Sequence, residues 1–196
     1  IYSVPAFAQP TGRLGTIPFD ERWFAYNPYA EWYCNSVRCG FGPSYEHHLK
    51  TYGKEFDYEN FADLFKAENY DPDEWAKLFA ASGAKYVIPT TKHHDGFCLW
   101  NSAYTDYNSA VRGPGRDLMA PLCESVRKEG LRFGVYYSGM LNWHITHNAM
   151  LSDYEVHHPD NCTYEYADFA YKQIFEFYAE IYDVEEAGTI YAGCAT

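Results

Sequence analysis

The sequence predicts an α/β fold in which helices alternate with parallel strands, and two observations carry that prediction. Between residues 71 and 182, three amphipathic helical patterns alternate with two short apolar runs. The apolar runs, 84–90 and 131–137, do not alternate with polar residues, which is typical of strands covered on both faces. The parallel sheet is therefore either open or closed into a barrel.

The three helical patterns have recognisable ends. The first starts after the N-cap residue Asp71, with Pro72 in its first turn, and it ends at Gly83. The second helix is expected at 117–129 and the third at 164–182. The predicted apolar sides are Trp75, Leu78 and Phe79 in the first helix, Leu118, Leu122 and Val126 in the second, and Ala167, Ala170, Tyr171, Ile174, Phe177, Tyr178 and Ile181 in the third.

The N-terminal part of the chain, residues 1–56, is aromatic and turn-rich. It predicts one short helix, Ser44–Tyr52, which Gly53 ends. The whole chain contains 20 Tyr, 13 Phe and 5 Trp, which together make 19% of its residues. Such a surplus fits either a core of large side chains or the flat walls of a ligand site, and composition alone favours the core.

Length, charge and cysteine content exclude several classes of protein. The 196 residues suit one domain but fall short of the roughly 250 residues of a complete (β/α)8 barrel. The formal net charge of −12 argues against nucleic-acid binding. Mean hydropathy is −0.47 and no apolar run is long enough for a membrane span, so we expect a soluble chain with no membrane partner. Cys98 and Cys123 are expected to be buried, whereas Cys34 and Cys39 are near enough for a disulfide, which leaves the compartment open.

Ligand sites in parallel α/β folds lie at the carboxyl ends of the strands, where this sequence places polar residues. His93 and His94 follow the first apolar run, in a loop opened by Gly96, and we predict that this pair binds a polar ligand. Both rings can reach one ligand only if the backbone has left β geometry there. Lys92 and Asp95 flank the pair and are expected to form an ion pair that fixes the loop.

Other candidate residues have a structural alternative. Glu31 and Trp32 offer a carboxylate and a ring for a sugar, but these two residues taken alone favour a core Trp beside a surface Glu. The same ambiguity holds for Trp100 and Trp143. The histidine pairs 47–48 and 157–158 are expected at the surface. A metal-dependent hydrolase would use His93, His94 and His144, and we rank it last; motifs of serine hydrolases, P-loop proteins and nicotinamide enzymes are absent from the sequence.

Several strings of the sequence occur together in one known family. They are 2–7, 31–33, 83–87 continuing to 91–100, 116–117 and 130–138, with Lys-His-His-Asp-Gly-Phe at 92–97 the most specific. Up to about residue 182 the chain resembles the α-L-fucosidases of glycoside hydrolase family 29. The resemblance implies a retaining exo-glycosidase on a (β/α) barrel that releases terminal L-fucose from oligosaccharides or glycoconjugates without a cofactor or metal. It also implies that the fucose-contacting residues are Glu31, Trp32, His93, His94 and Tyr136, with Glu31 also a candidate for assisting proton transfer.

The sequence departs from the family pattern at both ends. It starts after the Phe-x-x-His-Trp-Gly segment of the family, and 183–196 lacks the Trp-x-Asp motif that carries the nucleophile. We therefore expect residues 1–182 to form roughly the first half of a (β/α)8 barrel, followed by a divergent tail at 183–196. The catalytic residues stay unassigned, and the chain alone is expected to be inactive, with a non-catalytic sugar-binding fragment as the alternative. The uncovered edge of such a half barrel would favour a homo-oligomer or a complementing C-terminal fragment.

Overall fold

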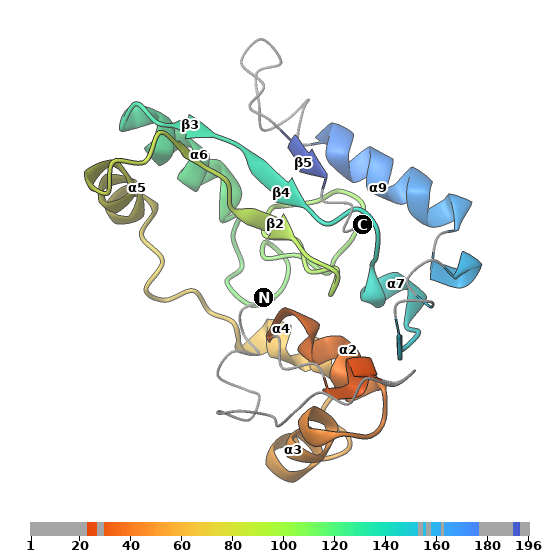
Figure 1. Ribbon diagram of the computed structural model, residues 1–196. Helices are drawn as coiled ribbons and strands as arrows, with labels where there is room; N and C mark the ends of the chain where they lie inside the picture. Colours follow the sequence, from red (N-terminus) through yellow and green to blue (C-terminus); the bar gives the residue numbers. More distant parts are fainter. Residues whose placement is uncertain are drawn as a thin grey trace.

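The computed structural model describes residues 23–26, 30–152, 155, 158–161, 163–176 and 190–192, which form two halves (Figure 1). One half gathers the short N-terminal helices, and the other contains the parallel strands and the helices that pack on them. The predicted helix Ser44–Tyr52 is confirmed, and Gly53 follows it with a φ of +85°. The helical half comprises the 3-10 helices η1 (Trp23–Tyr26), η2 (Ala30–Trp32) and η3 (Tyr58–Asn60) and the α-helices α2 (Tyr33–Arg38), α3 (Pro43–Tyr52) and α4 (Phe61–Leu64).

The second half, called the sheet half below, confirms the predicted α/β class. Its elements are α5 (Pro72–Ala81), β1 (Tyr86–Val87), β2 (Thr90–Lys92), α6 (Met119–Lys128), β3 (Arg132–Phe133), β4 (Val135–Tyr137), α7 (Trp143–Thr146), η4 (Pro159–Asn161), α9 (Tyr164–Glu176) and β5 (Ile190–Ala192). β1 pairs with β3, and β4 lies between β2 and β5. All of these pairings are parallel. β5 lies within the segment expected to diverge from the family.

Each predicted strand is divided into two short strands. The first is interrupted at Pro89, which has no N–H to donate, and the second at Gly134. Hydrogen bonds continue across both interruptions, because Gly134 N donates to Val87 O at 2.9 Å and Tyr136 N donates to Pro89 O at 2.9 Å. The two divided strands therefore still run side by side along their whole length.

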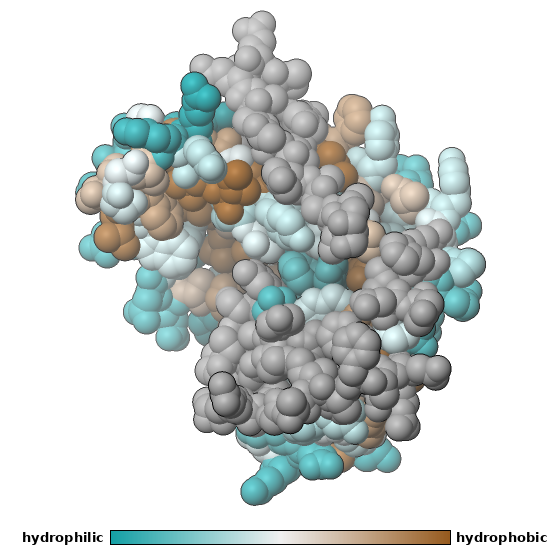
Figure 2. Space-filling view, in the orientation of Figure 1, coloured by the Kyte–Doolittle hydropathy of each residue, from teal (hydrophilic) through white to brown (hydrophobic). Residues whose placement is uncertain are grey.

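The expectation that both apolar runs are covered on both faces is wrong for the first run. Tyr86 is 65% exposed and Ile88 is 40% exposed, whereas Val135 and Tyr137 of the second run are buried. Tyr86 and Ile88 are two residues apart and therefore lie on the same face of the chain, and the described residues leave this face uncovered. Figure 2 shows apolar, brown side chains over α5 and the strands beside it, and Leu78 of α5 is 66% exposed.

Local hydrogen bonds explain where α5 and α6 begin. The carboxylate of Asp71 accepts from Glu74 N at 3.0 Å at the start of α5, as its sequence predicts. The carboxylate of Asp117 accepts from the backbone N–H groups of Met119 and Ala120 at the start of α6. The predicted apolar side of α6 is buried, and α5 packs against α6. In the part of the chain that the structure describes, no helix is both long and apolar enough to cross a membrane.

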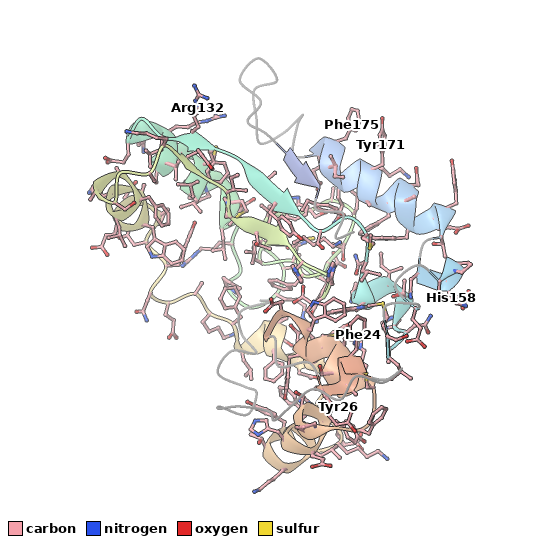
Figure 3. The ribbon with its side chains drawn as sticks, in the orientation of Figure 1. Phe24, Tyr26, Arg132, His158, Tyr171 and Phe175 are labelled. Carbon is pink, nitrogen blue, oxygen red and sulfur yellow. The ribbon has the colours of Figure 1, made fainter. Side chains whose placement is uncertain are left out.

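The predicted apolar side of α9 is correct for Ala170, which is buried, and for Ile174, which packs against the core, but it is wrong for two other residues. Ala167 and Tyr171 are exposed, and the buried side is formed by Tyr166, Ala170, Gln173 and Glu176. Figure 3 shows Tyr171 and Phe175 extending from α9 away from the strands. Polar residues are buried here because they have partners: Gln173 Oε1 accepts from Tyr137 OH at 2.8 Å, and Glu176 Oε2 accepts from Trp100 Nε1 at 2.8 Å. Phe177, Tyr178 and Ile181 of the prediction lie outside the described residues.

Each half has its own buried core. The sheet half packs aliphatic side chains such as Leu122 and Val126 with Trp100 and Phe133. The helical half packs mainly aromatic side chains, and part of the sheet half reaches into its core. The residues that reach in are Phe97, Tyr107, Leu141, Trp143 and Met150. The two halves therefore meet along a packed boundary.

Candidate active site

The five residues predicted to contact a sugar lie together at the boundary of the two halves. The sheet half contributes His93 and His94 directly after β2, and Tyr136 from β4. The helical half contributes Glu31 and Trp32 from η2. The ring of Trp32 lies 5.6 Å from that of His94, and the ring of His93 lies 6.2 Å from that of Tyr136, measured between centroids. Glu31 precedes Trp32 in η2, and its negative charge is near enough to His93 to oppose the lowering of the His93 pKa.

The two imidazoles face the same region because the chain turns immediately after β2. Gly96 N donates to His93 O at 3.1 Å, and Gly96 has a φ of +84°, a conformation that side chains other than glycine rarely adopt. The ring centroids of His93 and His94 are 4.3 Å apart, so these neighbours do not point to opposite faces as they would on a strand. The backbone has therefore left β geometry here, which is what the two rings need in order to reach one ligand.

His94 is held by contacts on several sides. Its Nδ1 lies 2.7 Å from Ser138 Oγ, and its ring lies 5.3 Å from the ring of Trp143. Burial holds the pKa of His94 well below its ordinary value, and the charges of His93 and Lys92 lower it further. Burial also lowers the pKa of His93, although the negative charges of Asp95 and Glu31 oppose that shift. Both rings are therefore neutral near pH 7.

Lys92 is a buried cation that ties three parts of the sheet half together. Its ammonium donates to Ser138 O at 2.7 Å, to Leu141 O at 3.2 Å and to Tyr166 OH at 3.1 Å. Burial lowers the pKa of Lys92 to about 8. The expected ion pair with Asp95 is wrong, because Asp95 instead accepts from Tyr58 OH at 3.1 Å and Phe97 N at 3.3 Å. Lys92 and Asp95 still fix the loop, each through its own partners.

Two residues outside the predicted set belong to the site. Trp143, at the start of α7, is fully buried, and its ring lies 5.2 Å from that of Trp32 at 71°. Phe24, which Figure 3 labels, also packs against Trp32, with 4.7 Å between the ring centroids. Trp143 follows the second strand, which was a usable signal, whereas nothing in the sequence pattern distinguishes Phe24. Trp100 serves the core beside α9 instead.

The residues of the metal hypothesis do not converge. His144 donates from Nδ1 to Glu59 Oε1 at 2.9 Å and stacks on Tyr107 at 4.4 Å between centroids, whereas His93 and His94 face Trp32 and Tyr136. Among the residues described, no group of three or more His, Cys, Asp or Glu side chains could hold a metal ion.

The structure decides the expectations for the other histidines and for the cysteines. His48 is 2% exposed rather than at the surface, because its ring bonds Tyr33 OH at 3.0 Å and Phe56 O at 2.7 Å. His158 is exposed as expected, and His157 lies outside the described residues. Cys98 and Cys123 are buried as predicted. Cys34 and Cys39 are both free thiols, so the disulfide considered for them does not form.

Comparison with known proteins shows which family the chain belongs to. The family model for alpha-L-fucosidase matches residues 1–187. An alpha-L-fucosidase of Dictyostelium discoideum is 37% identical over 147 residues, covering 73% of this chain and 28% of that protein. Tissue alpha-L-fucosidase of Mus musculus is 46% identical over 103 residues, or 52% of this chain and 23% of that protein. The crystal structure of Thermotoga maritima alpha-fucosidase in complex with fucose matches with a TM-score of 0.82 and 54% identity, covering 92% of this chain and 40% of that one.

This chain belongs to the α-L-fucosidase family, a family of glycoside hydrolases. It spans between about a quarter and two fifths of the length of the relatives just named.

Proposed function

We propose that this chain forms the fucose-binding part of a retaining α-L-fucosidase, on roughly the first half of a (β/α)8 barrel. The observation that carries the proposal is the convergence of Glu31, Trp32, His93, His94 and Tyr136 from two separate halves of the molecule. The ligand class is a terminal α-L-fucose on an oligosaccharide or glycoconjugate. The fucose found with the Thermotoga maritima structure supports this class.

The side chains of the site suit a deoxy-sugar. Neutral imidazoles at His93 and His94 offer directional N–H and N groups to hydroxyls, and Glu31 offers a carboxylate acceptor. The rings of Trp32 and Tyr136 offer flat faces for the C–H groups of the sugar. An analogue that lacks a recognised hydroxyl would leave a buried polar group unpaired, at a cost of about 1–3 kcal/mol, which is a physical source of specificity.

Hydrolysis needs more than this site supplies. A retaining glycosidase uses two carboxyl groups about 5–5.5 Å apart, one as nucleophile and one as acid/base. Glu31 is the carboxylate among the five site residues, and the segment 183–196 contains no Trp-x-Asp motif for the nucleophile. We therefore expect binding without turnover from these 196 residues alone. Glu31 remains a candidate for assisting proton transfer once a nucleophile is present.

The same observations support a second function, a sugar-binding fragment without catalysis. The binding side chains are assembled, while the carboxylate pair is not. The apolar surface at Leu78, Tyr86 and Ile88 supports a further partner on this chain, either a second copy or a complementing C-terminal fragment. Adding such a fragment separates the two functions, because only the enzyme would gain turnover.

The test uses an aryl α-L-fucoside, whose released aglycone is measured by absorbance. The chain is assayed alone and mixed with a fragment of a family member that carries the rest of the barrel. We expect no release from the chain alone and release from the mixture. His94→Ala should abolish release in the mixture, whereas the exposed His158→Ala should not change it. If neither the chain alone nor the mixture releases aglycone, but the chain binds fucose saturably, the result would favour the non-catalytic function.

A further inference from the structure

We infer that Ser138 is a positioning residue that fixes the proton of the His94 ring on Nε2, so that His94 meets its ligand as a hydrogen-bond donor. The inference deepens the proposed function and rests on it, because it assigns the direction of one contact between His94 and the sugar. Ser138 is not among the predicted site residues. It occurs in the sequence string 130–138 only as the residue that follows the second predicted strand.

The geometry places Ser138 against the inner nitrogen of His94. Ser138 follows β4 directly and is fully buried, with 0% of its surface exposed. Its Oγ lies 2.7 Å from His94 Nδ1, which is a short hydrogen bond between neutral groups. With Nδ1 engaged, Nε2 is the remaining nitrogen of His94 for a ligand.

Lys92 holds the backbone of Ser138 from both sides. Ser138 N donates to Lys92 O at 3.0 Å, and Ser138 O accepts from Lys92 Nζ at 2.7 Å. The Lys92 ammonium is itself anchored on Leu141 O and Tyr166 OH. The peptide of Ser138 is therefore fixed, and its hydroxyl can turn only about the Cα–Cβ and Cβ–Oγ bonds of its short side chain.

Proton counting decides the direction of the bond between Ser138 and His94. The His94 ring is neutral because its pKa is lowered, so it carries one N–H. Among the described residues, the hydrogen-bond partner of Ser138 Oγ is His94 Nδ1, and the buried hydroxyl has no access to bulk water. If Nδ1 carried the proton, the hydroxyl hydrogen of Ser138 would be buried without an acceptor, which is costly. Ser138 therefore donates to Nδ1, and Nε2 carries the proton.

The consequence is a fixed donor in the sugar site. An Nε2–H group can only donate, so the oxygen that His94 contacts must accept and is free to donate elsewhere. Without Ser138, the two neutral forms of His94 would become closer in energy, and part of the population would present an acceptor instead. A ligand that needs the donor form would then bind more weakly. Its apparent Kd would rise because part of the protein would carry the proton on Nδ1, and because the His94 ring would be less well oriented.

Imidazole nitrogen NMR on the ligand-free chain tests the protonation directly. In the unaltered protein, His94 should show a protonated Nε2 and an unprotonated Nδ1, and Ser138→Ala should shift both signals toward mixed values. Ser138→Thr, which keeps a hydroxyl, should restore the original pattern. Ser125→Ala is the matched control, because Ser125 is also a buried serine but donates to Asp73 away from the site. A protonated Nδ1 in the unaltered protein would overturn the inference.

Titration of the same proteins with L-fucose tests the effect on binding. Ser138→Ala should raise the Kd about tenfold, as expected for one misdirected hydrogen bond, while Ser125→Ala should stay within about twofold of the unaltered protein. An unchanged Kd in Ser138→Ala would overturn the positioning role. If the unaltered protein binds no L-fucose at all, the proposed function fails, and the spectrum of the ligand-free protein still decides the protonation of His94.

Discussion

The two halves of the molecule are built from different kinds of packing. In the sheet half, Leu122 and Val126 project at helical spacing into a core shared with β3 and β4. In the helical half, rings meet edge to face, as where Phe61 lies 5.0 Å from both Tyr52 and Phe56. The first core follows from a regular period in the sequence, and the second follows from ring contacts that have no fixed period.

The candidate site lies where these two kinds of packing meet, so its shape depends on bonds that cross the boundary. Tyr58 of the helical half donates to the buried Asp95 in the histidine loop at 3.1 Å. Asn35 exchanges two hydrogen bonds of 2.8 Å with Met150 on the segment after α7. We therefore expect changes at the boundary to disturb the site more than comparable changes elsewhere.

The largest expected effect comes from Gly96→Ala. A Cβ at this position would lie 2.3 Å from Asn142 Oδ1 and 2.7 Å from His144 Cβ, and the φ is already positive. The free energy of unfolding should fall by about 3 kcal/mol or more, measured by urea denaturation. Gly83→Ala is the matched control, with a φ of +83° and no atom within 4 Å, and should cost only about 1 kcal/mol. Equal losses would show that the boundary is not tightly packed at Gly96.

The next effect comes from Lys92→Met. Methionine keeps the approximate length of the side chain but removes the buried donor of Ser138 O and Tyr166 OH, while Leu141 O keeps only its hydrogen bond from Tyr166 OH. We expect a loss of about 3 kcal/mol in the free energy of unfolding. Lys172→Met, at an exposed helical ion pair, should change it by less than about 0.5 kcal/mol. A stable Lys92→Met protein would mean that the sheet half does not need this cation.

A smaller effect is expected from Tyr58→Phe, which removes one hydroxyl from the boundary. Asp95 would keep the hydrogen bond from Phe97 N but lose that from Tyr58. Because the lost bond goes to a buried carboxylate, we expect a loss of about 1.5 kcal/mol in thermal or urea unfolding. Tyr164→Phe provides the control, since Tyr164 is 84% exposed and its hydroxyl should contribute less than about 0.5 kcal/mol. Similar effects of the two changes would contradict a tie between the halves at Tyr58.

The smallest effect is a dependence of stability on pH that differs between the halves. His94 has a lowered pKa when folded, so the unfolded chain takes up its proton first as pH falls below about 6.5, and stability decreases there. Glu59 acts at lower pH. Burial opposes its ionisation, but the hydrogen bond from His144 and the positive charges of His144, Arg38 and His147 together outweigh burial and lower the pKa of Glu59, so its stabilisation is lost only below about pH 4.5.

Urea unfolding at pH 7 and pH 5 measures the contribution of His94. The free energy of unfolding should fall by about 1–2 kcal/mol over this interval through His94. His94→Gln should reduce that fall, while His158→Gln, at an exposed site, should leave it unchanged. An identical fall in all three proteins would show that His94 is not held neutral by burial.

The sequence predicted the parts of the fold that local rules determine. Asp71 and Pro72 define the start of α5, and the two apolar runs pair as parallel strands, because caps and burial patterns act over a few residues. The buried side of α9 was not predictable, since Gln173 and Glu176 are buried only through partners far away in the sequence. Apart from α3, the short helices of the helical half, η1, η2, α2, η3 and α4, were not predicted, because their packing depends on contacts between rings.

The candidate site was predictable in its members but not in its supports. His93 and His94 stand out because they follow a predicted strand, whereas Glu31 and Trp32 are singled out only by the family resemblance. The partners Ser138 and Lys92 act through hydrogen bonds that only the folded chain brings together. The family resemblance is confirmed, whereas the contacts of the five site residues with fucose stay a prediction.

Titration with L-fucose, followed by the indole N–H signals of tryptophan in NMR, tests the central claim most directly. The signal of Trp32 should shift saturably with L-fucose, and that of Trp75, exposed on α5, should not move. D-fucose, the mirror image with the same functional groups, should produce no saturable shift. An equal response to both sugars, or none at Trp32, would contradict a fucose site at the boundary of the two halves.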